Sequence, residues 1–514
     1  WDFQTKLTWQ ASARTTVSFI GVGAIDEFSF KPAKDATAEN VYILNSNPLI
    51  NQWNYTAGVS VKHLISNGYI TASLSRNDYQ NRLDKFEDNI AMDESDRTLK
   101  VVSNETENKL RLTVDKYING WKYAFGGVLQ QVGFTNDYYN RIRKELRDAN
   151  GNIIQNALAF NFNTDLQFWK YGFFGQLSRS VLNDKLGLTF GLRTDMNSFT
   201  QSGNQPLQTL SPRFAAGYRI NDQWKINTSV GKYFKIPIYT VLGFQNQAGD
   251  YVNKNSKYIA STHYVAGVEY LPKEDLRFTV EGFYKKYDRY PVSLLTGISL
   301  ANQGGEFGAI GNEAITSTGK GEAYGFEVYG QQKLTGSLFA VVSYTFVRSK
   351  FSGVNGLSIP SAWDNRHLVS LILGKKLGRG WELGLKYRYA GGAPYTPFDA
   401  TLSQQNYLTL GTGILDYNQL NTLRLKGFSQ FDLRLDKKWN YQKWTLDLFL
   451  DVQNLLVTQN PAYPQYTFQR LADNSGFATT DGQPLQENGS NAIPLILVND
   501  DAIATTSIGL IVEF

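Results

Sequence analysis

The sequence has no cysteine and only three histidines, His63, His263 and His367, among its 514 residues. Without cysteine the chain can form neither a disulfide framework nor a zinc–thiolate site. Three histidines argue against a histidine-rich metal centre. We therefore predict no metal site and no cofactor.

Long apolar runs and signs of nucleic-acid binding are also missing. No stretch approaches the roughly 18 to 20 apolar residues that a membrane-spanning helix needs, and no signal peptide is recognisable. The chain opens on WDFQTKLTWQ, which already alternates like a strand and has no initiator Met. We interpret it as a mature or truncated chain. The net charge is only +5 and no basic run stands out, which argues against nucleic acid as a partner.

What the sequence has instead is alternation with a period of two. In residues 444–453 the apolar Leu446, Leu448 and Leu450 alternate with polar residues such as Asp447 and Asp451. We count about nineteen such segments, most of them roughly 10 to 17 residues long, whereas soluble strands usually run about 5 to 6 residues. A tilted membrane-spanning strand needs about 9 to 11. The lengths therefore favour strands that cross a membrane.

The connections between these segments alternate between short and long. The short ones carry hairpin-turn residues: SNG (66–68), NG (119–120), LND (182–184), IND (220–222), PKED (272–275), TG (335–336) and GRG (378–380). The long ones are predicted at 31–51, 84–104, 141–164, 200–208, 236–260, 294–322, 352–364, 397–426 and 457–504. Short turns at one rim and long loops at the other are typical of an outer-membrane β-barrel.

A soluble sandwich, solenoid or propeller is the alternative to a membrane barrel. Such a fold must cover its apolar face, and no helices are available for that purpose. The polar face carries charge on strand after strand, as expected for a water-filled lumen. We therefore predict an all-β fold, a transmembrane antiparallel β-barrel that occupies residues 1–514.

The predicted strand count has a consequence for closure of the barrel. If the short turns are periplasmic, the first and last strands both run inward and are parallel to each other. A closed antiparallel barrel needs an even number of strands. We therefore expect an odd number of further strands before Trp1.

Several stretches resemble hairpins of the TonB-dependent outer-membrane receptors, particularly the Bacteroidota-type members. The matching stretches are GFFGQLSRSVLNDKLGLTFGLRTDMNSF (172–199), LSPRFAAGYRINDQWKINTSVGKYFKIP (210–237), the hairpins at 263–292 and 319–351, the D-x-RH and G-x-PYTP elements within 361–397, and the penultimate hairpin at 431–456. The resemblance implies a 22-stranded barrel whose lumen holds an N-terminal plug domain. Nineteen strands would leave three, an odd number, for the start of the barrel. Neither a plug nor a TonB box is recognisable in this chain, so we expect both, with the first strands, to lie before Trp1.

The predicted lumen wall carries charges on adjacent strands. The resemblance implies that these residues face the plug: Arg193, Arg277, Glu281, Glu327, Asp432, Arg434, Asp447 and Asp451. General solvation of the lumen and cross-strand pairing explain the same pattern. Asp447 and Asp451 also invite a general acid/base interpretation, but neither a histidine nor a nucleophile accompanies them. We predict that the protein is not an enzyme.

Aromatic residues are frequent in the long loops and are the candidates for substrate binding, because aromatic rings supply large contact areas. These candidates are Trp53, Phe244, Tyr251, Tyr395, Phe398, Tyr407, Tyr463 and Tyr466. A girdle at the membrane interface is the alternative role. The acidic stretch DKFEDNIAMDESD (84–96) could supply oxygen ligands to calcium, but it lacks EF-hand spacing, and a solvated loop explains it better.

The C-terminus, SIGLIVEF, ends in the middle of an apolar alternation. Its Ser507, Gly509, Val512 and Phe514 resemble the signal that the barrel assembly machinery reads. A closing strand with an interfacial aromatic is the alternative.

These features predict an outer-membrane receptor that binds a scarce nutrient at its extracellular loops and imports it with TonB-coupled energy. Siderophore, cobalamin, oligosaccharide and peptide all remain open as substrates. The predicted partners are outer-membrane lipid and lipopolysaccharide, TonB–ExbB–ExbD through the plug, the assembly machinery and a surface lipoprotein. A passive porin-like or protein-secretion channel is the alternative function.

Overall fold

One antiparallel sheet contains most of the chain. A computed structural model describes residues 1–514 except 33, 35–36, 149, 305–309, 474 and 499–501. In this described part the sheet has twenty strands, of which β17 (Ile359–Pro360) is only two residues long. The nineteen that remain match the predicted number. They are β1 (Asp2–Ser12), β2 (Thr15–Phe28), β3 (Leu49–Ile65), β4 (Gly68–Phe86), β5 (Arg97–Ile118), β6 (Trp121–Arg143), β9 (Leu158–Val181), β10 (Leu186–Asn197), β11 (Ser211–Arg219), β12 (Trp224–Lys235), β13 (Ile259–Lys273), β14 (Leu276–Ser293), β15 (Ile315–Thr335), β16 (Leu338–Ser352), β18 (Arg366–Gly378), β19 (Trp381–Ala390), β22 (Phe428–Asn440), β23 (Thr445–Gln453) and β26 (Thr505–Glu513).

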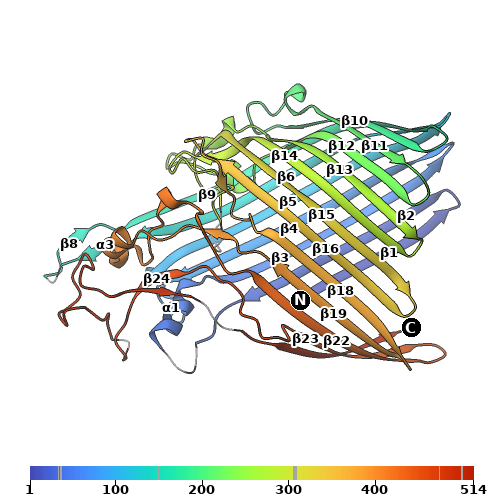
Figure 1. The fold of residues 1–514 in the computed structure, drawn as a ribbon. Coiled ribbons are helices and arrows are strands. Elements are labelled where there is room, and N and C mark those ends of the chain that lie inside the picture. The colour runs from blue at the N-terminus through green and yellow to red at the C-terminus, as the bar shows by residue number, and fades with distance from the viewer. Residues whose placement is uncertain (33, 35–36, 149, 305–309, 474, 499–501) are drawn as a thin grey trace.

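Each long strand pairs antiparallel with the next one along the chain. Figure 1 shows that the strands at the front slant in one direction and those at the back in the other, so the sheet curls around on itself. The meander confirms the predicted all-β antiparallel architecture.

The two ends of the sheet differ, as the connections predict. At one end, which we call the short-turn end, consecutive strands are joined by a few residues, and Asn119 (φ 51°) with Gly120 (φ 77°) forms one such turn. Positive φ at both central residues is what a tight two-residue hairpin turn requires. At the other end, the long-loop end, the connections include 236–258, 391–427 and 454–504.

The strands near the N-terminus are longer than predicted. β5, β6 and β9 have 22, 23 and 24 residues, so residues 97–104, 141–143 and 158–164 of the loops expected at 84–104 and 141–164 are strand. The apolar alternation stops before these strands end, but the backbone ladder does not. Polar pairs maintain it, for example Gln52 with Asn81, whose side chains hydrogen-bond at 2.7 Å. At about 3.3 Å per residue, these strands extend well beyond the hydrocarbon layer of a bilayer.

The two faces of the sheet have the predicted character. On β23 the apolar Leu448 and Leu450 are 43% and 38% exposed on the outer face, whereas Asp447 on the inner face is 7% exposed. On β10 and β14, Phe190 and Val280 are likewise exposed on the outer face. The outer face therefore exposes apolar side chains suited to lipid.

The sheet has two free edges, formed by β1 and β26. Among the described residues β1 pairs only with β2, and β26 pairs only with β23. Because every neighbouring pair is antiparallel and nineteen long strands follow one another, β1 and β26 run in the same direction. The parallel relation predicted for the first and last strands is present.

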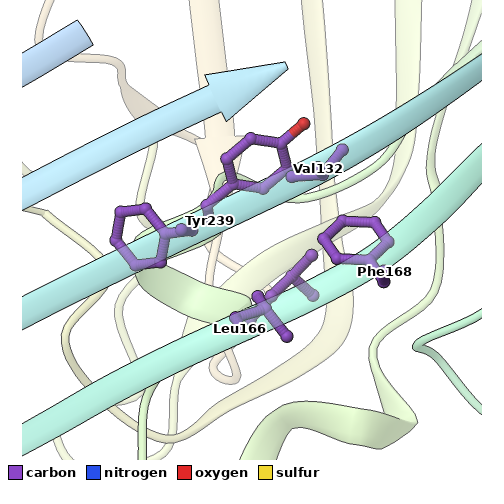
Figure 2. Packing of buried hydrophobic residues seen from close by; sticks show 6 residues of the cluster. Val132, Leu166, Phe168 and Tyr239 are labelled. Atoms are coloured by element: carbon purple, nitrogen blue, oxygen red, sulfur yellow. The ribbon is translucent and has the colours of Figure 1, made fainter. Parts of the chain in front are cut away.

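A loop at the long-loop end folds over the inner face of β6 and β9. Its helix α2 (Tyr239–Leu242) packs Tyr239 and Leu242 against Val132, Leu166 and Phe168, and Figure 2 shows their side chains converging between the two strands. Lys170 on β9 donates to Glu107 on β5 at 2.7 Å, and the Tyr239 hydroxyl donates to the same carboxylate. This packing narrows the interior of the barrel.

Short elements make up the remainder of the long-loop end. They are α1 (Ala38–Ser46), α3 (Ala400–Leu410), the hairpins β7 (Leu146–Arg147) with β8 (Ile153–Gln155), β20 (Pro394–Tyr395) with β21 (Leu423–Arg424) and β24 (Gln465–Phe468) with β25 (Pro494–Leu497), and the single turns η1 (Glu94–Asp96), η2 (Pro206–Thr209), η3 (Val252–Asn255) and η4 (Tyr417–Gln419). In the residues that the structure describes, no helix has the length and apolar character needed to cross a membrane.

Candidate functional site

The described residues of the two last long loops, 391–427 and 454–504, form one compact unit around buried aromatic rings. Helix α3 is capped at its N-terminus by Asp399, whose carboxylate accepts from the Leu402 backbone N–H at 2.9 Å, and at its C-terminus by Gly411 with φ 67°. Its Tyr407 packs on Tyr466 and Phe468 of β24 and donates to or accepts from Thr467 at 2.7 Å. Burial raises the pKa of the Tyr407 hydroxyl, which therefore stays protonated at neutral pH.

This unit borders an open cavity of about 510 Å³. Tyr395, Phe398 and Tyr466 contribute aromatic surface, and Arg424 and Lys426 contribute positive charge. Pro397, Pro461 and Pro464 stiffen the wall, because proline fixes its own φ angle. The volume lies within the range of small-molecule sites, which are mostly apolar with a few placed polar groups.

A buried carboxylate, Asp364, holds one of the residues that line the cavity, Arg424. Asp364 is fully buried, accepts from the Ser349 backbone N–H at 2.7 Å, and pairs with Arg348 at 3.3 Å and with Arg424. Arg424 also donates to the Gly392 carbonyl at 3.0 Å. Asp364 thus ties the end of β16 and the loop after it to β21, and it fixes the guanidinium that lines the cavity.

Two glycines let these segments approach each other closely. A Cβ atom on Gly391 would lie 2.1 Å from the Asn365 carbonyl oxygen, and one on Gly392 would lie 1.7 Å from the Leu425 carbonyl oxygen. Both neighbours are backbone atoms, which cannot rotate away as side chains do. The D-x-RH and G-x-PYTP elements therefore meet in the structure and build one site.

The predicted aromatic candidates divide between three places. Tyr395, Phe398 and Tyr466 line the cavity, Tyr407 lies in the core beside it, and Tyr463 lies in the same loop. Phe244 stacks on Phe160 with ring centroids 5.8 Å apart, and Tyr251 packs against the inner-face cluster of α2. Trp53 lies on β3, where it stacks on Tyr55 at 6.0 Å. A role of each in substrate binding stays a prediction, and the geometry brings only three of them together around one cavity.

The predicted lumen-wall residues all lie on the inner face of the sheet, as their register partners show: Arg193, Arg277, Glu281, Glu327, Asp432, Arg434, Asp447 and Asp451. Arg193 pairs with Asp195 at 2.5 Å, Arg277 with Glu269 at 2.6 Å, and Arg434 with Asp436 at 2.8 Å. Asp447 lies 3.7 Å from Lys438. Ion pairs thus balance part of the charge on the wall, whereas Glu281 and Glu327 are register partners of like charge. Contact with a plug stays a prediction.

Arginine side chains pair with part of the acidic stretch at 84–96. Asp84 pairs with Arg82 at 2.5 Å and also with Arg97, and Glu94 pairs with the same Arg97 at 2.5 Å. The Arg97 guanidinium holds the pKa of Glu94 below its usual range. In the described part of the chain, no group of three or more acidic or histidine side chains is arranged to hold a metal ion.

The predicted assembly signal lies on the edge strand β26. Val512 faces outward opposite Leu446, and Phe514 is fully exposed one residue beyond the strand. Gly509 lies beneath Phe449, since a Cβ there would lie 2.2 Å from that ring, and Arg434 covers the ring at 3.9 Å. Packing against Phe449 thus explains why a glycine occupies position 509. The role of these residues as an assembly signal, including that of Ser507, stays a prediction.

Comparisons with known proteins agree with this architecture. The family model described as "TonB dependent receptor-like, beta-barrel" matches residues 2–455, and no curated protein sequence matches the chain. Among solved structures, FpvA from P. aeruginosa bound to heterologous pyoverdines is similar over 100% of this chain and 64% of its own, at 13% identity and a TM-score of 0.62.

Two further structures extend the comparison. The ferric citrate transporter FecA is similar over 100% of this chain and 70% of its own, at 11% identity and a TM-score of 0.61. The copper transporter OprC is similar over 90% and 67%, at 13% identity and a TM-score of 0.56. The chain spans less than two thirds of the length of FpvA, and at these identities the likeness concerns the fold alone.

Proposed function

Because the chain belongs to the TonB-dependent receptors, whose β-barrels lie in the outer membrane, we propose that it binds a scarce nutrient at its long loops and imports it with TonB-coupled energy. The long-loop end is then extracellular and the short-turn end periplasmic. The observation that carries the proposal is the cavity between loops 391–427 and 454–504, with its aromatic wall and positive rim.

The proposed cargo is a small nutrient that matches the size of this cavity. FpvA is described with pyoverdine and iron, FecA with ferric citrate, and OprC with copper. A metal carried in an organic complex fits a cavity that offers aromatic surface and cationic groups. Among the candidates left open by the sequence, a siderophore-like chelate therefore receives more support than an oligosaccharide, whose many hydroxyls need more polar partners.

A passive porin-like channel is less well supported. Porins close with about 16 to 18 strands, and the sheet already has nineteen long ones in its described part. We propose that residues 1–514 are one barrel domain, and that an odd number of further strands pairs with the free edges of β1 and β26. A plug domain in the lumen would supply the link to TonB–ExbB–ExbD.

Several partners follow from the same assignment. The apolar outer face would contact membrane lipid and lipopolysaccharide, and the barrel assembly machinery would read the end of β26. A surface lipoprotein could cover the long-loop end. No covalent chemistry is part of the proposed function.

The experiment that tests the proposal separates binding from energy-coupled uptake. The ligand that co-purifies with the receptor is first identified by mass spectrometry. The full-length receptor is then expressed in the outer membrane of a host that has no receptor of its own for this ligand. Uptake of the labelled ligand is then measured with and without TonB. We expect surface binding to persist without TonB and accumulation to fall at least about tenfold, because lumen passage depends on energy from TonB. Equal accumulation in both hosts would support the passive channel and contradict the proposal.

A further inference from the structure

A single register row across four strands brings three basic side chains to the inner face. Arg213 on β11 is the register partner of Gly231 on β12. Gly231 pairs in turn with His263 on β13, and His263 pairs with Lys285 on β14. Strand neighbours such as Phe214, Tyr264 and Tyr284 are exposed on the outer face. The basic groups therefore point into the barrel.

An aromatic ring fills the gap in this row. Gly231 has no side chain, and the hydroxyl of Tyr233 lies 2.9 Å from where its Cβ would be. The Tyr233 ring lies 4.3 Å from the Arg213 guanidinium and 4.5 Å from the His263 ring. The His263 Nε2 atom is 2.7 Å from the Ser261 hydroxyl. The tyrosine thus orients two of the basic groups and adds a hydroxyl between them.

The row has no acidic counterpart among the residues that the structure describes. The nearby Asp195 on β10 is already paired with Arg193 at 2.5 Å. Glu281 is four residues from Lys285 along β14, about 13 Å away at the rise of a strand. Neither Arg213 nor Lys285 has an ion-pair partner in this part of the chain, in contrast with Arg277 and Arg434 elsewhere on the wall.

One donor of the row is buried without an acceptor. The Nε atom of Arg213 is shielded from solvent and has no hydrogen-bond partner in the described part of the chain. Leaving such a group unpaired is costly, and most so for a charged one. A guanidinium prefers planar oxyanions, which can accept two of its hydrogen bonds at once.

We propose that Arg213, Tyr233, His263 and Lys285 form a binding site for a small carboxylate-bearing ligand on the wall of the lumen. The inference rests on the proposed function, since it assigns the class of cargo that passes this wall: a polyanionic organic molecule. Arg213 and Lys285 lie about 14 Å apart at the backbone, three strand spacings, and their long side chains can reach two carboxylates of one ligand. This lumen site is separate from the cavity between the long loops.

Isothermal titration calorimetry of the purified protein in nonionic detergent tests the site. The probe is benzene-1,3,5-tricarboxylate, and its uncharged counterpart is benzene-1,3,5-trimethanol. We expect the tricarboxylate to bind and the triol to give no heat. Arg213→Gln and Lys285→Gln should each weaken binding about tenfold, the loss typical of one charge-assisted hydrogen bond. Added salt should weaken it further.

Lys286→Gln is the matched control. Lys286 is exposed on the outer face of the same strand, so its replacement removes the same charge without touching the row, and we expect an unchanged Kd. Heat-dependent gel migration confirms that each variant is folded. Absence of tricarboxylate binding, or equal weakening by all three substitutions, would overturn the site.

The outcomes also separate this site from the proposed function. If uptake depends on TonB but the Arg213 and Lys285 variants bind the tricarboxylate like the parent protein, only the lumen site is wrong. If uptake does not depend on TonB but these variants bind the tricarboxylate more weakly, the lumen site is supported and the proposal of energy-coupled import is wrong.

Discussion

Replacing Asp364 with Ala is expected to lower the stability of the long-loop end by about 3 to 5 kcal/mol, the usual cost of breaking a buried ion pair by removing one partner. Arg348 and Arg424 would lose the carboxylate that they share, and the Ser349 backbone N–H would lose its acceptor. Arg424 would then be free to leave the cavity wall. The affinity for a ligand at the cavity should fall by at least about a hundredfold. That loss corresponds to about 3 kcal/mol, which is no larger than the expected loss of stability.

Limited proteolysis and ligand titration of the same preparation measure this effect. Cleavage within 391–427 should accelerate while the strands stay protected. Asp416→Ala is the control, because Asp416 accepts from the Asn418 backbone N–H at the exposed turn η4 but takes no part in the Asp364 cluster. If the loops of the Asp364→Ala protein resist the protease as well as those of the Asp416→Ala protein, the buried ion pairs of Asp364 do not organise the site.

Replacing Gly392 with Ala is expected to have the second-largest effect. The new methyl group would lie 1.7 Å from the Leu425 carbonyl oxygen, so segment 423–426 must shift by more than an ångström. Forcing extra volume into a packed site costs about 1 to 3 kcal/mol. Because Leu425 and Lys426 line the cavity, its shape changes with the shift, and ligand affinity should fall about tenfold or more.

Gly175→Ala is the matched control for this prediction. Gly175 lies within β9, and nothing lies within 4 Å of a Cβ built there. We expect its melting temperature and its ligand affinity to equal those of the parent protein. Thermal unfolding followed by tryptophan fluorescence, with ligand titration beside it, compares the two variants. A Gly392→Ala protein that binds as well as the Gly175 variant would contradict the close-approach argument.

The strands and their order could be predicted from the sequence because the physics is local. Alternation with a period of two survives in every membrane-crossing segment, since one face must meet lipid and the other water. Asn119–Gly120 and similar pairs marked the turns, since few other residues adopt positive φ cheaply. Inner-face residues such as Arg434 and Asp451 followed from the same alternation.

The lengths of the N-terminal strands could not be predicted from the alternation of apolar and polar residues. Once β5, β6 and β9 leave the bilayer, both faces tolerate polar residues and the alternation loses its contrast. Backbone pairing then continues for reasons that are not local, such as the packing of α2 onto Val132 and Phe168. For this reason the loops predicted at 84–104 and 141–164 were too long, and the observed connections lie within those ranges.

The candidate site was only partly predictable. Tyr395 and Phe398 were singled out by residue type and position, and they do line the cavity. Asp364 appeared only within a resembling motif, because its partners Arg348 and Arg424 are far away in the sequence. The lumen row of Arg213, His263 and Lys285 depends on the register of four strands, which no single segment reveals.

The most direct test of the central claim is to locate the natural ligand. Cryo-electron microscopy of the receptor, purified together with its bound ligand, would show where that ligand lies. We predict ligand density in the cavity between loops 391–427 and 454–504, in contact with Tyr395 and Phe398 and within reach of Lys426. An empty cavity, with the ligand bound only at a site that none of these residues touches, would contradict the account.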